Sequence, residues 1–295
     1  LTDLPVITHD ERMTTSIART ACMIVRLDGL DAIERFTLEP VKLNEAMLAK
    51  VVKDNEARAA AAAAAEAKVA AIHRATDVKV DADDADWADV PSIPIARQGM
   101  AERGEARLAY DDQTLYALFE ITGDKSPWVN AGKDFGRLFK TGDAVDIQLS
   151  PTGNAKREPG VGDLRVVMAK YDRKPVAVLM KPVAPDAPAD AARTYTSPVG
   201  SRQFDVVKII DGAKVKAKTD GDGYIVEAAI PLDAIGLKPK AGETITGDVG
   251  FISSDSAGQV NSARTYWSNK NTNLVNDEPL EAWLAPHEWG KLTWE

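Results

Sequence analysis

The sequence predicts a mainly β fold, an antiparallel β-sandwich that follows a short β-rich segment and a long alanine-rich α-helix. From about Val78 onward, short runs of alternating apolar and polar residues are separated by turn residues every eight to twelve positions, which is typical of a sandwich. Before these runs lies an alanine-rich tract without Gly or Pro, which favours a helix. The chain has 295 residues, of which 44% are hydrophobic, and this is enough to bury a sizeable core.

Residues 1–41 are expected to form the β-rich segment. Two runs of strand-forming residues flank Asp28-Gly29, which is the usual chemistry of a tight hairpin turn. Because a two-stranded hairpin is not stable by itself in water, we expect it to be the end of an upstream domain. The chain begins with Leu1 rather than Met, which fits a processed chain or the C-terminal part of a longer protein.

Residues 42–76 are expected to form one long helix that links this segment to the sandwich. Asn44 suits the N-cap position, and Leu43 and Met47 begin an apolar stripe along the first half. Residues 59–65 are all alanine, so the second half offers no bulky side chains to a core. We therefore expect this helix to act as a spacer.

Residues 77–295 are expected to form the sandwich. Its final strand is predicted within "HEWGKLTW", where indoles alternate with polar residues and are expected to face the core. The other predicted strands lie near 92–97, 104–110, 114–121, 143–149, 163–170, 174–181, 203–209, 213–219, 223–230, 246–253 and 263–267.

Charge and composition limit the kind of partner. The formal net charge is -9, which disfavours nucleic acid and anionic membrane surfaces. No run approaches the roughly 20 apolar residues that cross a bilayer, so no transmembrane segment is predicted. The single cysteine, Cys22, supports no disulfide. A neutral or weakly charged ligand fits this composition best.

The order of several short motifs resembles that of the family-nine carbohydrate-binding modules and their DOMON-like, jelly-roll relatives, over roughly residues 77–295. The resemblance implies a non-catalytic sandwich that binds a polysaccharide or oligosaccharide, contains structural calcium, and accompanies a polysaccharide-degrading enzyme. It also implies an extracellular, periplasmic or cell-surface location. The motifs are "DADDADWADVPSI", "ARLAYDDQTLYALFEITGD", "KTGDAVDIQLSP", "GDLRVVMAKYD", "DGYIVEAAIPLDAIG", "GDVGFISSD", "YWSN" and "HEWGKLTW".

Ligand-binding positions follow from this resemblance. It implies that Trp267 forms an aromatic wall and that Asp146 and Arg165 bind sugar hydroxyls. The position at which the family commonly has a second tryptophan is Lys140 here, so the aromatic slot is incomplete at that point. Two other rings are candidates to replace the missing wall. They are Phe139 and Trp128.

The residue types suit a sugar, but each has a simpler structural role. A pyranose has an apolar C–H face that packs on an aromatic ring, and a rim of hydroxyls that carboxylates and guanidinium groups bind. Trp267 also fits a core position, since large aromatic residues are usually buried. Asp146 and Arg165 also fit a cross-strand ion pair.

Calcium is predicted only through the resemblance. The acidic stretches "DVKVDADDADWAD" and "FISSDSAGQVNSA" are rich in oxygen ligands, but neither has EF-hand spacing. Solvated surface is the alternative interpretation of both stretches.

Three other functions compete with sugar binding. Some DOMON-like sandwiches bind b-type haem for electron transfer, for which Met168 and His287 are the candidate ligands in this region. A cell-surface scaffold or adhesion role would make use of the long helix as a spacer. An enzyme is the third possibility, but the chain has no G-x-S-x-G and no H-E-x-x-H motif, so no catalytic residue is predicted.

Overall fold

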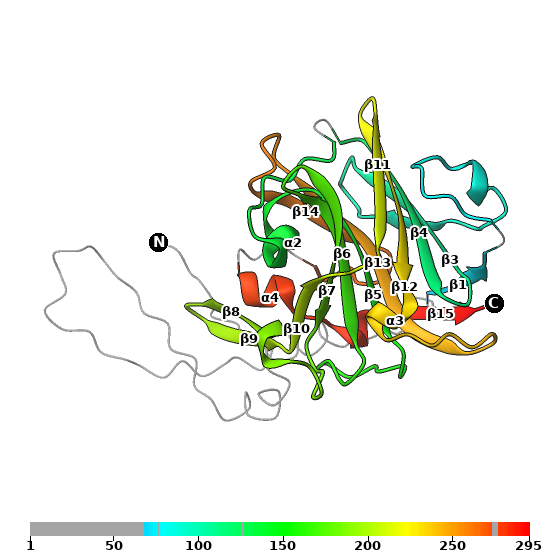
Figure 1. The fold of residues 1–295 in the computed structure, drawn as a ribbon. Helices are drawn as coiled ribbons and strands as arrows, with labels where there is room; N and C mark the ends of the chain where they lie inside the picture. Colours follow the sequence, from blue (N-terminus) through cyan, green and yellow to red (C-terminus); the bar gives the residue numbers. More distant parts are fainter. Residues whose placement is uncertain (1–67, 76, 125–126, 273–276) are drawn as a thin grey trace, which may run out of the picture. The chain divides into compact units, whose positions relative to one another are not determined.

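A computed structural model describes residues 68–295, except 76, 125–126 and 273–276 (Figure 1). Most of the strands in this part of the chain belong to one 13-stranded sheet, and β8 and β9 form a separate two-stranded sheet. The strands are β1 (Val69–Arg74), β2 (Ile93–Ala96), β3 (Arg103–Tyr110), β4 (Thr114–Thr122), β5 (Ala144–Ser150), β6 (Leu164–Tyr171), β7 (Lys174–Lys181), β8 (Arg193–Ser197), β9 (Gly200–Phe204), β10 (Val206–Ile209), β11 (Lys214–Asp220), β12 (Gly223–Pro231), β13 (Thr244–Ser254), β14 (Asn261–Tyr266) and β15 (Gly290–Trp294).

Short helices occupy the connections. Within the described residues the α-helices are α2 (Leu138–Thr141), α3 (Leu232–Ile235) and α4 (Glu278–Ala282), and 3-10 turns lie at Ala85–Trp87, Phe135–Arg137, Ala189–Ala191 and Pro286–Glu288. Asp277 caps α4, since its carboxylate accepts a hydrogen bond from the N–H of Leu280. Among the described helices, none is both long enough and apolar enough to cross a lipid bilayer.

The large sheet curls so that its two halves face each other, which gives the predicted sandwich. The strand order is β10-β7-β6-β5-β13-β15-β1-β3-β4-β12-β11, with β14 paired to β13 and β2 paired to β3. Most neighbours are antiparallel, as predicted, but β1 runs parallel to both β15 and β3. Tight hairpins join several pairs. Asp172 and Arg173, both at positive φ, connect β6 to β7.

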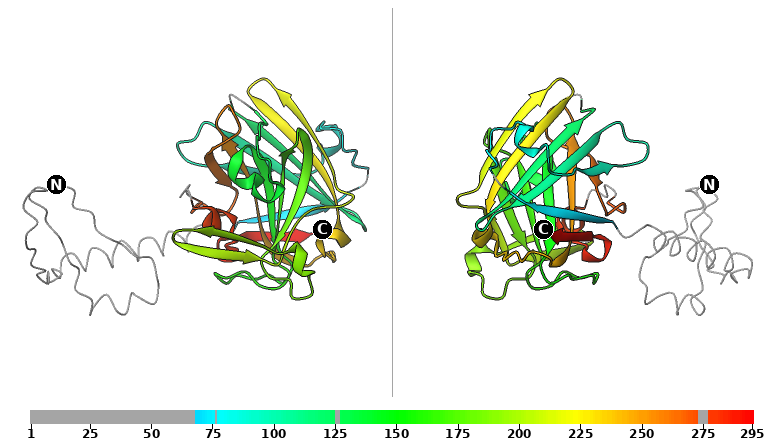
Figure 2. Two further views of the ribbon diagram at one scale, coloured as in Figure 1. Left: turned by 60° about the vertical axis from the view of Figure 1, so that its left-hand side comes forward. Right: turned by 90° about the vertical axis from the view of Figure 1, so that its right-hand side faces the viewer.

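The main core lies between the two halves of the sheet. Along β5, Val145, Ile147 and Leu149 face this core, whereas the alternating residues face the other side of the sheet. That outer side is also covered, by α2, α4 and the β8–β9 hairpin, and this gives a second apolar cluster that includes Phe139 and Phe204. The left view of Figure 2 shows the hairpin beside α4. Every residue of β5 is therefore buried.

One sequence-based assignment is wrong. The predicted helix was expected to extend to residue 76, but residues 69–74 form strand β1, and the sandwich starts there rather than at residue 77. The physical reason is tertiary pairing: β1 hydrogen-bonds on both edges and buries Ile72 completely, which outweighs the helix propensity of its alanines. Residues 1–41 and most of the predicted helix lie outside the described residues. The final strand predicted near the C-terminus is confirmed as β15, and Trp294 faces the main core as expected. Trp289 does not, because it precedes β15 and its indole N–H donates to Gln148 on the outer side of the sheet.

Candidate functional site

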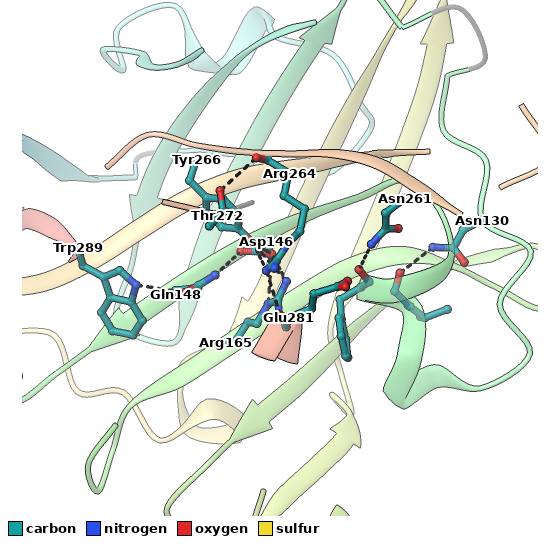
Figure 3. Close-up of polar contacts among 12 residues, drawn as sticks. Asn130, Asp146, Gln148, Arg165, Asn261, Arg264, Tyr266, Thr272, Glu281 and Trp289 are labelled. Atoms are coloured by element: carbon teal, nitrogen blue, oxygen red, sulfur yellow. Dashed lines mark hydrogen bonds and ion pairs between the residues drawn. The ribbon is translucent and has the colours of Figure 1, made fainter. Parts of the chain in front are cut away.

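A cluster of buried polar side chains lies on the outer side of β5, β6 and β14 and is hydrogen-bonded to α4 (Figure 3). We call it the polar cluster. It consists of Asp146, Gln148, Arg165, Arg264, Tyr266, Glu281 and Trp289. The strands place the five side chains of β5, β6 and β14 together because alternate residues of neighbouring strands point to the same side of the sheet. Glu281 comes from α4, and Trp289 directly precedes β15.

Asp146 and Arg165 form an ion pair at the centre of the polar cluster. Nη2 of Arg165 lies 2.5 Å from Oδ2 of Asp146, and its Nε lies 3.2 Å from the same oxygen. Both side chains have no exposed surface. Because each charge lacks water, each depends on the other and on further hydrogen bonds for its stabilisation.

Tyr266 completes this central group. Its hydroxyl donates to Oδ2 of Asp146 at 2.5 Å and accepts from Nη2 of Arg165 at 3.2 Å. Burial raises the pKa of Tyr266 to about 12, so the hydroxyl keeps its proton at neutral pH and remains a donor.

The main chain of α4 is held by two arginines of the polar cluster. The carbonyl oxygen of Glu281 accepts from Nη1 of Arg165 at 3.1 Å and from Nη2 of Arg264 at 3.0 Å. The Glu281 carboxylate accepts through Oε1 from the ammonium group of Lys140 at 2.8 Å. These bonds fix α4 against the sheet.

Gln148 and Trp289 extend the polar cluster to one side. Nε2 of Gln148 donates to Oδ1 of Asp146 at 3.1 Å, and its Oε1 accepts from the indole N–H of Trp289 at 3.1 Å. Trp289 is 8% exposed, so the chain of bonds from the central ion pair to its indole is itself buried.

Three buried polar atoms around the polar cluster have no hydrogen-bond partner in the described part of the chain. They are Oε2 of Glu281, Nε of Arg264 and Oδ1 of Asn261. Buried polar groups usually have a hydrogen-bond partner, so these two acceptors and one donor are exceptions in the interior of the protein.

Trp283 is the aromatic residue at the edge of this region. It follows α4 directly and is half-buried. The guanidinium of Arg202 lies 4.7 Å from its ring centroid, and its indole N–H donates to Glu158 at 3.3 Å. Trp283, Arg202 and Lys140 are partly exposed, and Lys140 forms an ion pair with Glu281 of the polar cluster.

Asp248 supports the turn that follows β14. Its Oδ1 accepts from the N–H of Ser268 at 2.8 Å, and its Oδ2 accepts from the N–H of Asn269 at 2.7 Å. The side chain is fully buried. Burial raises the pKa of Asp248 to about 7, against the opposite effect of these N–H donors, and Asp146 contributes to the rise.

The predicted outward orientation of Trp267 is not observed. Its ring is 5% exposed and belongs to the main core. Gly290 explains the packing, since a Cβ at that position would lie 2.6 Å from the Trp267 ring. The missing side chain at Gly290 leaves the space into which the indole fits. The ligand-binding role of Trp267 stays a prediction.

The structure brings three of the five predicted site residues together. Phe139 lies beside the ion pair, with the guanidinium of Arg165 5.2 Å from its ring centroid, but it is only 1% exposed. Trp128 lies elsewhere, in the main core, 5.2 Å from the ring of Tyr224. An open slot with two aromatic walls is therefore not formed by Trp267, Phe139 and Trp128 in this structure.

Sequence reasoning missed most of the polar cluster. Arg264 and Tyr266 are two residues apart on one predicted strand, so period-two alternation was the signal that they share a face. Glu281 gave no such signal, because a glutamate within "DEPLEAW" is typical of an exposed position. It is buried only by the packing of α4.

Calcium ligands are not evident in the described part of the chain, where no three His, Cys, Asp or Glu side chains are arranged to hold a metal ion. In the acidic stretch near Trp87, Asp81 and Asp83 accept hydrogen bonds from main-chain N–H groups two residues further on. Glu227 accepts from the N–H of Ala82 and from the indole of Trp87. Calcium stays a prediction.

Comparison with known proteins supports the predicted family. Residues 188–295 match the family model described as "Carbohydrate family 9 binding domain-like". The resemblance is confirmed for this part of the chain. The matched region spans β8 to β15 and contains Arg264, Tyr266 and Glu281 of the polar cluster. No curated protein matches the sequence significantly.

One solved structure shows the same fold, and two others are similar to a lower degree. A family 9 carbohydrate-binding module from Caldicellulosiruptor kristjanssonii in complex with cellotriose matches with a TM-score of 0.51 and 20% identity, over 77% of this chain and 94% of that one. The module from the same organism in complex with glucose matches with a TM-score of 0.48 and 20% identity, over 77% and 96% of the two chains. A putative carbohydrate-binding protein from Bacteroides uniformis matches with a TM-score of 0.43 and 12% identity, over 77% and 99%.

Proposed function

We propose that residues 68–295 form a non-catalytic carbohydrate-binding module whose ligand binds at the margin of the polar cluster. One observation carries this proposal. Asp146 and Arg165, the two polar residues that the resemblance assigns to sugar binding, are hydrogen-bonded to each other and to Tyr266, and Tyr266 lies within residues 188–295, which match the carbohydrate family 9 model.

The chemistry at this margin suits a neutral sugar. Trp283 supplies an apolar ring with the guanidinium of Arg202 beside it, and Lys140 supplies an ammonium group at the Glu281 carboxylate. Asp146 and Arg165 are fully buried, so in this arrangement they act through the main chain of Glu281, which orients α4 and with it Trp283. Direct contact of a sugar with Asp146, Arg165, Trp267, Phe139 or Trp128 would require α4 or the core to move.

Calorimetric titration with neutral oligosaccharides tests the proposal. We expect saturable binding by the unchanged chain, and a loss of about tenfold in affinity or more on Trp283→Ala, because the aromatic surface is removed. Val199→Ala is the matched control, since Val199 is an exposed apolar side chain near the tip of the β8–β9 hairpin. The proposal fails if no neutral glycan binds, or if both variants bind as the unchanged chain does.

The setting of the module is proposed from the resemblance alone. An extracellular, periplasmic or cell-surface location and attachment to a polysaccharide-degrading enzyme are what the carbohydrate-binding modules of this kind lead us to propose. Structural calcium belongs to the same set of proposals. Cell fractionation and sequencing of the native full-length gene would test the first two.

The haem alternative receives no support from the positions of its candidate ligands. Met168 packs within the main core, whereas His287 lies on the surface, where its Nε2 is 3.4 Å from Glu288. A colourless purified protein would agree with sugar binding, and an absorption band in the haem Soret region would contradict it.

A further inference from the structure

A surface hollow of about 830 Å³ lies far from the polar cluster. It is formed where β1 ends, where β3 turns into β4, and where α3 follows β12. Figures 1 and 2 show α3 beside the C-terminal end of the chain and α4 on the opposite side of the sandwich. The volume is within the range of small-molecule sites in proteins.

The floor of the hollow is apolar and held in place by the main chain. It is lined by Leu232 and Leu237, which are buried, and by the prolines on either side of them. The N–H of Leu232 donates to the carbonyl of Gln113 at 2.8 Å, and the N–H of Leu237 donates to the carbonyl of Leu232 at 2.9 Å. Gly236, at φ 74°, allows the chain to turn between them. The hollow is therefore already formed without a ligand.

The rim carries side chains with unused hydrogen-bonding capacity. The ammonium group of Lys238 and the amide group of Gln113 are exposed and make no hydrogen bond or ion pair with other described residues. Asp233 adds a carboxylate to the rim, of which one oxygen accepts from the N–H of Ala234. Ammonium groups only donate, carboxylates only accept, and amides do both.

A flat cationic surface completes the rim. The guanidinium of Arg74 lies 5.2 Å from the ring centroid of Tyr110, and half of the Arg74 side chain is exposed. Asp112 holds it by an ion pair at 2.5 Å. A planar group stacked in this way offers its outer face and its remaining N–H donors to a ligand.

We infer that this hollow is a second binding site, for a neutral polyhydroxylated ligand such as one unit of an oligosaccharide. Its rim combines two cations with three carboxylates, those of Asp111, Asp112 and Asp233, so a charged ligand of either sign would meet like charges. A hydroxyl both donates and accepts, which matches a rim with both kinds of partner, and the apolar floor suits the C–H face of a sugar.

The inference shares its ligand class with the proposed function but uses different residues. Sites on opposite sides of one sandwich would allow two chains of a polysaccharide, or two points on one chain, to be bound at once. Such bivalent binding raises the overall affinity for a polymer above the affinity of either site for a short oligosaccharide.

Titration of isotope-labelled protein with cello-, xylo- and mannotriose, followed by amide NMR, tests the inference. We expect at least one trisaccharide to shift the amides of residues 111–114 and 232–238, with a dissociation constant on the order of 1 mM. The double change Lys238→Ala and Gln113→Ala is expected to weaken this effect about tenfold, because it removes two hydrogen-bonding groups. Lys240→Ala, an exposed lysine outside the hollow, is the matched control.

This experiment distinguishes a failure of the present inference from a failure of the proposed function. Trp283→Ala should leave the shifts at the hollow unchanged, so binding at the hollow can persist even if the proposed α4 site binds nothing. The inference is overturned if these amides do not move with any of the three sugars, or if the double change alters them no more than Lys240→Ala does.

Discussion

The carboxylate of Asp146 lies 2.5 Å from the guanidinium of Arg165, and neither side chain has any exposed surface. Strands β5 and β6 bring the two residues together, and Tyr266 of β14 donates to the same carboxylate oxygen. The pair also reaches α4 through the carbonyl of Glu281. A cross-strand ion pair was one of two roles expected for these residues, and this pair couples the centre of the sheet to the proposed ligand surface.

Arg165→Met should destabilise the fold strongly. It leaves a buried carboxylate without its cation, a change that typically costs about 3–5 kcal/mol of unfolding free energy. The double change Asp146→Asn and Arg165→Met should recover part of that loss, since no buried charge then remains unpaired. Urea unfolding of the single and double variants measures both effects. A loss below about 1 kcal/mol for Arg165→Met would contradict the buried pairing.

Trp267→Ala should lower the unfolding free energy, so a loss of sugar binding in this variant would not by itself show that the ring contacts a sugar. The ring is buried in the main core, and deletion of a buried aromatic side chain costs about 3–5 kcal/mol. Trp283→Ala should cost clearly less, because Trp283 is half-buried. Thermal unfolding compares the two variants. Equal melting temperatures for Trp267→Ala and the unchanged chain would place the ring outside the core and would favour its predicted role as a sugar-binding wall.

Stability should fall as the pH rises from about 4 to about 7. The pKa of Asp248 is raised in the folded state to about 7 from its ordinary value of 3.8, so between these values the folded protein retains a proton that the unfolded chain has lost. Burial raises the pKa of Asp143 to about 6 and acts in the same direction. Each such group lowers the unfolding free energy by up to about 1.4 kcal/mol for each unit by which the pH rises in this range.

Asp248→Asn separates the contribution of Asp248 to this pH dependence from that of Asp143. The variant cannot ionise at this position, so its unfolding free energy should vary less between pH 4 and pH 7 than that of the unchanged chain, and Asp143→Asn serves as the comparison. Urea titrations at several pH values give the profiles. An unchanged profile in Asp248→Asn would show that Asp248 does not titrate in this window.

Calcium, if it binds as the resemblance implies, should raise the melting temperature. A ligand that binds only the folded state stabilises it by about 2.7 kcal/mol at a hundredfold excess over its dissociation constant. We expect a higher melting temperature in millimolar calcium than after chelation, with magnesium as the control cation. Identical melting curves with calcium, with magnesium and after chelation would contradict the prediction of structural calcium.

Most of the strands could be predicted from the sequence because alternation of apolar and polar residues is a local property. The runs that became β3, β4, β6, β7 and β12 are bounded by turn residues and bury every second side chain against the main core. The central pair of the polar cluster could also be named, although only through the family resemblance.

Tertiary structure decided the rest. Whether residues 69–74 are helix or strand depends on hydrogen bonds to β15 and β3, which lie far away in the sequence. The orientation of Trp267 depends on the space left by Gly290, and the burial of Glu281 depends on the contact of α4 with the sheet. Periodicity tells which residues share a face of a strand, but only the packing of distant segments determines whether that face is covered.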